Sequence, residues 1–167
     1  MDYDQERADL LDALRTRRQF LRFTVNGLSD EQARARTTAS GLCLGGLIKH
    51  VAEVERRWAN FITEGPSAMA WDPSAASDYA RGFELLEGES LAGVLDVYEK
   101  VGSATDVLVM DLPGLDMSQP LPEAPWFEPG ASRSARQVFL HIIAETSQHA
   151  GHADIIRESL DGQKTMG

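Results

Sequence analysis

The sequence is poor in three features that would each indicate a particular class of protein. It contains a single cysteine, Cys43, among 167 residues, so no disulfide framework forms within the chain. No apolar run approaches the roughly 20 residues that cross a bilayer. No alternating apolar and polar segment is bounded by a hairpin turn signal, so strand pairing is not predicted. These absences favour a helical protein in the reducing cytoplasm, away from membranes.

Positive charge is scarce as well. The chain has 16 Lys and Arg against 26 Asp and Glu, which gives a net charge of -10 at pH 7. A surface of this sign repels phosphate backbones and anionic membranes at long range, so neither nucleic acid nor a membrane is an expected partner. The N-terminal segment, residues 1–11, is acidic and amphipathic, unlike a secretory signal peptide.

Helical periodicity is what the sequence does contain. Apolar residues recur at three- and four-residue spacing over residues 4–25, 44–64, 90–112 and 132–160. Turn and cap residues separate these segments. Ser29 with Gln32 predicts a capping box that opens a short connecting helix, Ser90 is the predicted cap of the third long helix, and Gly162 is predicted to end the fourth. We therefore predict an all-α fold, a four-helix bundle in a single domain over residues 1–167. The connections over residues 66–89 and 112–130 are unusually long for a bundle.

Core positions follow from the same periodicity. Cys43 is expected to be a small buried residue at a helix start, because nothing adjacent would activate its thiol. Trp58 and Trp126 are expected to anchor the core and a loop, respectively. In the third helix the predicted inward residues are Leu91, Val94, Leu95, Tyr98, Val101, Val107 and Leu108.

The chemically informative residues are histidines and one glutamate in the last helix. His141, Glu145 and His149 are spaced by four, and His152 and Ile156 continue the row. At about 100° per residue these positions fall on one helical face. A histidine and a carboxylate one turn apart are the arrangement with which helices present two ligands to one metal ion.

A third ligand is available from the second helix. His50 shares the apolar face of that helix with Leu47, Val54 and Phe61, where a solvated imidazole is not expected. Two histidines and a carboxylate leave an open coordination position, as in catalytic zinc sites, and the same set suits iron. The spacing alone is equally compatible with a hydrogen-bonded core histidine and a surface ion pair.

Two segments carry a resemblance to a known family. SGLCLGGLIKHVAEVERRW and HIIAETSQHAGHADIIRE resemble the DinB-like superfamily of metal-binding four-helix bundles, in particular its actinobacterial mycothiol-dependent branch. The resemblance implies one divalent metal ion held by His50, Glu145 and His149, with zinc preferred and nickel or iron as further candidates. Many members have a histidine where this chain has Glu145, whereas the mycothiol-dependent maleylpyruvate isomerase has a glutamate there.

The resemblance also implies an activity. In related thiol transferases the metal binds the sulfur of a low-molecular-weight thiol, so the expected function is a metal-dependent S-transferase in which a metal-bound thiolate attacks an electrophilic small molecule. Mycothiol is the expected thiol cosubstrate. His152 is the candidate catalytic residue, as a base or as a partner of a metal ligand. Arg157 is the candidate cofactor-binding residue. Arg133 and Arg157 both suit the pairing of a carboxylate, and a role as ordinary surface residues is the alternative for both.

Two other functions fit the same residues. One is a non-catalytic metal-binding module for stress response or dimerisation, in which the ion stabilises the bundle and a homodimer is the expected assembly. The other is a metal-dependent hydrolase that uses bound hydroxide. An open coordination position favours either enzyme, whereas a closed shell of four ligands favours the module.

Overall fold

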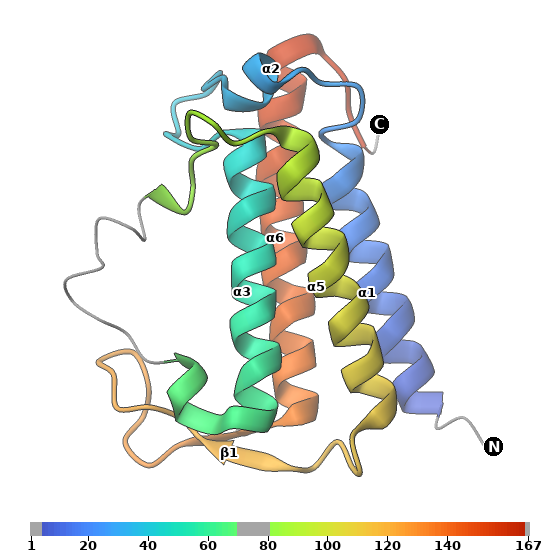
Figure 1. Cartoon of the computed structure of the whole chain (residues 1–167), viewed down its shortest axis with the longest axis vertical. Coiled ribbons are helices and arrows are strands. Elements are labelled where there is room, and N and C mark those ends of the chain that lie inside the picture. Colours follow the sequence, from blue (N-terminus) through green and yellow to red (C-terminus); the bar gives the residue numbers. More distant parts are fainter. Residues whose placement is uncertain (1–4, 70–80, 166–167) are drawn as a thin grey trace.

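Four long helices form a bundle in the computed structural model, which describes residues 5–69 and 81–165 (Figure 1). These helices are α1 (Gln5–Phe23), α3 (Leu44–Glu64), α5 (Leu91–Asp111) and α6 (Ala135–Asp161). The short elements are α2 (Asp30–Arg34), the 3-10 helix η1 (Gly65–Met69), β1 (Ser118–Pro120) and β2 (Ser132–Ser134). The predicted all-α bundle is confirmed. None of the described helices is both long and apolar enough to cross a membrane.

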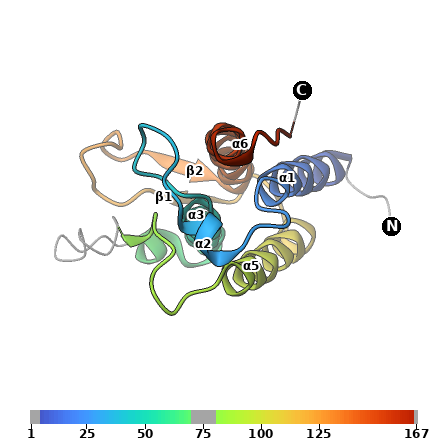
Figure 2. The same cartoon turned by 90° about the horizontal axis from the view of Figure 1, so that it is seen from above.

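The helix directions explain one of the long connections. α1 and α6 run in one direction, and α3 and α5 run in the other (Figure 1). Viewed along the bundle, α3 lies between α5 and α6, and α1 lies between α6 and α5 (Figure 2). Because α3 and α5 are parallel neighbours of 21 residues each, the chain must travel back along the bundle, about 30 Å, before α5 begins.

Local sequence signals set most helix boundaries. Ser29 and Gln32 form the predicted capping box at the start of α2, and Ser134 with Gln137 forms a second one at α6. The Ser90 side chain accepts a hydrogen bond from the Gly93 amide at the start of α5, as predicted. α6 ends at Gly162, whose φ of 81° lies in the left-handed region that glycine adopts without strain.

A polar layer divides the core into two apolar halves. One half packs residues of α2 and the adjoining ends of the long helices, and the other packs the ends near the β-hairpin. Between them lies a buried ion pair, in which the Arg18 guanidinium of α1 donates to the Glu55 carboxylate of α3 at 2.6 and 3.1 Å. Buried threonines of α5 and α6, Thr105 and Thr146, lie at the same level of their helices. The middle of the bundle is therefore its most polar cross-section.

Three sequence-based expectations are wrong. β1 and β2 pair antiparallel, with Gln119 opposite Arg133, although no strands were expected. Val107 is 59% exposed, because the buried face of α5 continues through Thr105 and Val109 instead. Trp126 does not anchor its loop in the core, since it is 64% exposed. Cys43 and Trp58 are buried, as expected.

Candidate metal centre

Three of the predicted ligands converge where α3 meets α6. His50 of α3 and Glu145 and His149 of α6 each offer one ligand atom, and these atoms all lie within 4.8 Å of one another. Glu145 and His149 reach the same place because one helical turn separates them. His141, which stands one turn before Glu145, is not a member of this group.

The His50 ring packs against two other aromatic rings. Phe83 stacks on it with a centroid distance of 3.9 Å and an interplanar angle of 22°, and the His149 ring meets it edge-on at 4.9 Å. Phe83 reaches this position because the backbone of its loop lies against α3 at Gly46. A Cβ atom at Gly46 would lie 1.8 Å from the Phe83 carbonyl oxygen, so only glycine is accommodated there. Gly46 thereby permits the packing that orients a candidate ligand.

The Glu145 carboxylate lies between two histidines of its own helix. Its Oε2 is 3.5 Å from His149 Nε2, and its Oε1 is 3.8 Å from His141 Nε2. Both distances exceed the usual 2.7–3.2 Å of a good hydrogen bond. The carboxylate is 30% exposed, so it is reached from solvent. This spacing leaves the oxygens and the facing ring nitrogens available to a common partner.

The electrostatic setting favours neutral imidazoles. Burial, together with the neighbouring His149, lowers the pKa of His50 from 6.5 to about 4. Burial also lowers the pKa of His149, against the opposing effect of Glu145. Uncharged imidazoles keep a lone pair at neutral pH, and a metal ligand needs this lone pair. Two such rings and one carboxylate are a donor set that suits zinc or another first-row divalent cation.

The remaining predicted site residues lie at different distances from this group. His152 is exposed, and its Nδ1 is 3.5 Å from the Nδ1 of His149. Arg157 lies two turns further along α6 and is buried. Its guanidinium donates to the carbonyl oxygens of Thr24 and Asn26 and to the Asp161 carboxylate. The structure thus places His152 beside the candidate ligands and Arg157 against the end of α1.

Aromatic side chains border the group on the side toward the β-hairpin. Trp58 of α3 meets His141 edge-on at 4.6 Å and Phe127 at 6.4 Å. The Arg133 guanidinium lies 4.8 Å above the Trp58 ring. No sequence signal marks Phe83, Phe127 or Trp58 as site residues, because their contacts join segments far apart in the chain. Gly45 and Gly46, which precede His50, are a local signal that another segment packs closely against α3 at this point.

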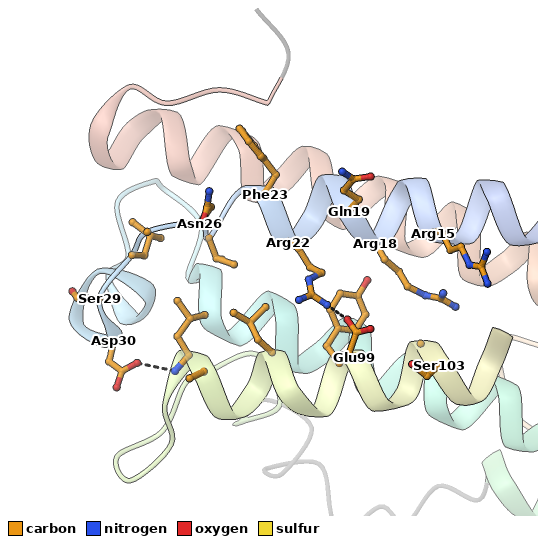
Figure 3. A pocket seen from close by; sticks show the side chains of 18 residues that line it. Arg15, Arg18, Gln19, Arg22, Phe23, Asn26, Ser29, Asp30, Glu99 and Ser103 are labelled. Carbon is orange, nitrogen blue, oxygen red and sulfur yellow. Dashed lines mark hydrogen bonds and ion pairs between the residues drawn. The ribbon is translucent and has the colours of Figure 1, made fainter. Parts of the chain in front are cut away.

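A large cavity lies elsewhere in the bundle. It measures about 760 Å³ and is lined by residues of α1, α2, α5 and the loop after α1, including Arg15, Arg22 and Glu99 (Figure 3). Neither α3 nor α6 contributes to its lining. Figure 2 places this seam between α1 and α5 across the bundle from the seam of α3 and α6. The cavity is therefore separate from the candidate metal centre.

Fold and candidate site together define a DinB-like helical bundle that presents a His–Glu–His group between two antiparallel helices. A family model described as mycothiol-S-transferase matches residues 9–162. The chain therefore belongs to the mycothiol-S-transferase family, a DinB-like branch. The family name implies a transferase that uses mycothiol. No curated relative matches the chain.

Proposed function

We propose that this protein is a metal-dependent mycothiol S-transferase that joins the thiol to an electrophilic small molecule. One observation carries the proposal: ligand atoms of His50, Glu145 and His149 lie within 4.8 Å of one another in a chain of this family. These residues would hold the cation, with zinc preferred and nickel or iron as further candidates. A location in the cytoplasm and a homodimeric state are predictions from the sequence.

The chemistry begins with ionisation of the thiol. A bound divalent cation would lower the pKa of the cosubstrate thiol, so that thiolate forms near neutral pH. The protein residues provide the neutral ring nitrogens of His50 and His149 and the single negative charge of Glu145. The stacked Phe83 ring covers one face of His50 and limits the access of water to it.

His152 is the proposed acceptor of the thiol proton. Its Nδ1 lies 3.5 Å from His149, and the side chain is exposed, so it is able to pass a proton to water. After the proton leaves, the sulfur forms a bond to the electrophilic carbon, and the leaving group departs with the electrons of the broken bond. A second role is open to the same ring: it would orient His149 by accepting a hydrogen bond from its Nδ1–H.

The test is the variant His152→Ala, assayed with mycothiol and 1-chloro-2,4-dinitrobenzene. If His152 accepts the thiol proton, the variant should keep a metal content near that of the wild type, and its turnover should be slowed roughly 100- to 10,000-fold. Gln148→Ala, at an exposed position of the same helix, is the matched control and should leave both quantities unchanged. Wild-type turnover in His152→Ala would remove this residue from the mechanism.

The wild-type protein also tests the transferase itself. Chelator should abolish thioether formation, and readdition of one divalent ion per chain should restore it. A wild type that holds its metal ion and forms no thioether with mycothiol and any electrophile tested would favour the non-catalytic metal-binding module instead.

A further inference from the structure

Arg133 is a cation with aromatic neighbours beside the candidate metal centre. It lies in β2, opposite Gln119 of β1. Its guanidinium is 4.8 Å above the Trp58 ring and 6.0 Å from the Phe127 ring centroid. Stacking on an aromatic face fixes the plane of a guanidinium and leaves the N–H groups at its edge available. The two rings thus hold the cation in place without neutralising it.

This guanidinium makes ring contacts but no hydrogen bond or ion pair with any residue in the ranges 5–69 and 81–165. The contrast with other arginines is clear. Arg18 donates to Glu55 and Asp106, and Arg136 donates to Glu6 and Asp116. Arg157 donates to main-chain carbonyls and to Asp161. Arg133 is half-buried, and its N–H donors make no hydrogen bond within the described residues, so they can bind a ligand.

A chain of contacts connects Arg133 to the candidate ligands. The Trp58 ring beneath it meets His141 at 4.6 Å, and His141 Nε2 is 3.8 Å from Glu145 Oε1. The Trp58 and His141 rings therefore connect the cation to Glu145.

We propose that Arg133 binds a carboxylate of the electrophilic substrate. The inference rests on the transferase function and specifies its substrate class: electrophiles with a carboxylate at one end and an apolar body toward the reactive carbon. The carboxylate pairs with the guanidinium edge, and the apolar body lies toward the partly exposed His141 ring, since Trp58 itself is buried. The reactive carbon is then directed toward His50, Glu145 and His149. A single guanidinium fork matches one carboxylate in charge and in geometry.

Binding is tested first with unreactive analogues. Calorimetry compares 4-(hydroxymethyl)benzoate with its methyl ester on protein loaded with one zinc ion per chain. The wild type should bind the acid about 10- to 100-fold more tightly than the ester, as expected for a charge-assisted pair. Arg133→Gln should bind the two equally, and Arg133→Lys should keep part of the preference. All variants are loaded with the same amount of zinc. Any attraction of the zinc ion for the carboxylate is then the same in each variant, and the differences between variants report on Arg133 alone.

The matched control is Arg17→Gln. Arg17 also lies over an aromatic ring, 5.6 Å from the Phe20 centroid, but in α1, which supplies no candidate ligand. This variant should keep the full preference for the acid. Equal binding of acid and ester by the wild type would overturn the proposal, and so would an undiminished preference in folded Arg133→Gln.

Turnover separates this inference from the proposed function. With mycothiol, 4-(chloromethyl)benzoate forms a thioether while chloride leaves with the electrons of the C–Cl bond and the thiol proton passes to solvent. The wild type should use this acid at least tenfold more efficiently than its methyl ester, in kcat/KM, and Arg133→Gln should lose that ratio. Use of both compounds at equal efficiency would refute the role of Arg133 and leave the transferase intact. Binding that depends on Arg133, without thioether from either compound, would refute the transferase and leave the carboxylate site.

Discussion

Two groups of polar side chains lie near the middle of this bundle, and they differ in how their charges are balanced. Arg18 contacts both Glu55 and Asp106, with distances of 2.6 and 2.7 Å, and Glu55 is fully buried. This first group contains donors and acceptors in contact. The second group, at the seam of α3 and α6, brings together ring nitrogens of His50 and His149 and a carboxylate of Glu145.

The two groups differ in the cation that is available to their carboxylates. Arg18 supplies the positive charge that Glu55 requires, so the first group is complete within the protein. In the second group burial keeps both imidazoles largely unprotonated at neutral pH. Within residues 5–69 and 81–165, no lysine or arginine forms an ion pair with the Glu145 carboxylate. One bundle thus contains a buried structural ion pair in one place and a partly exposed candidate cation site in another.

The largest expected effect comes from breaking the first group. Arg18→Met leaves the Glu55 carboxylate buried without its partner, which should lower the free energy of unfolding by about 3–5 kcal/mol. Denaturant unfolding of metal-free protein measures this change. Arg56→Met removes one partner of an exposed pair with Glu53 and should cost less than about 1 kcal/mol. Equal losses in the two variants would contradict the comparison.

The second group should be sensitive to the packing around it. Gly46→Ala forces the Phe83 loop away from α3, because the new Cβ would lie 1.8 Å from a carbonyl oxygen. His50 then loses its stacked neighbour, and metal affinity should fall about 10- to 100-fold, as when an outer partner of a ligand is lost. Titration with a competing chelator measures the affinity.

Gly151→Ala is the control for this substitution. A Cβ at Gly151 meets nothing within 4 Å, so metal affinity should stay at the wild-type value. Replacement of glycine inside a helix should also raise stability by about 0.5–1 kcal/mol. If Gly46→Ala has the same metal affinity as the wild type, the stacking of Phe83 does not orient His50.

Acid provides a further contrast in the metal-free protein. His50 has a pKa lowered to about 4 in the folded state, whereas an unfolded histidine titrates near 6.5. Between these values the unfolded chain binds the extra proton, so stability should fall as pH decreases through this window, by about 1.4 kcal/mol per pH unit for one such group. The free energy of unfolding, measured against pH over this range, should fall more steeply for the wild type than for His50→Gln. Parallel slopes in the two proteins would contradict a lowered pKa of His50.

The smallest effect is expected at the exposed edge of the cavity between α1 and α5. Arg22 and Glu99 form an ion pair across this seam (Figure 3), with side chains 41% and 62% exposed. Water screens such a pair, so Glu99→Gln should change the free energy of unfolding by less than about 1 kcal/mol. A loss as large as that of Arg18→Met would mean that exposure does not separate the two kinds of ion pair.

Most of the fold was predictable because its signals are local. The capping box of Ser29 and Gln32, the cap at Ser90 and the stop at Gly162 each act within a few residues. The β-hairpin was missed because strands of three residues are too short to show alternation, and because 11 residues separate them. Val107 was wrongly predicted to face the core, because apolar residues at helical spacing in α5 also fit a neighbouring face of the helix.

The candidate site was predictable only in part. The four-residue spacing placed Glu145 and His149 together on one helix, and the apolar surroundings of His50 marked it as unusual. The packing of Phe83 on His50 and of Arg133 on Trp58 joins segments 33 and 75 residues apart. No periodicity links residues on different elements, so such contacts follow only from the assembled bundle.

The most direct test of the account is the metal content of purified variants. Elemental analysis should find close to one divalent ion per chain in the wild type and almost none in His50→Ala, because two remaining ligands bind weakly. His141→Ala should retain the ion, since His141 lies outside the converging group. Full retention in His50→Ala, or a loss in His141→Ala as complete as in His149→Ala, would contradict the assignment of His50, Glu145 and His149.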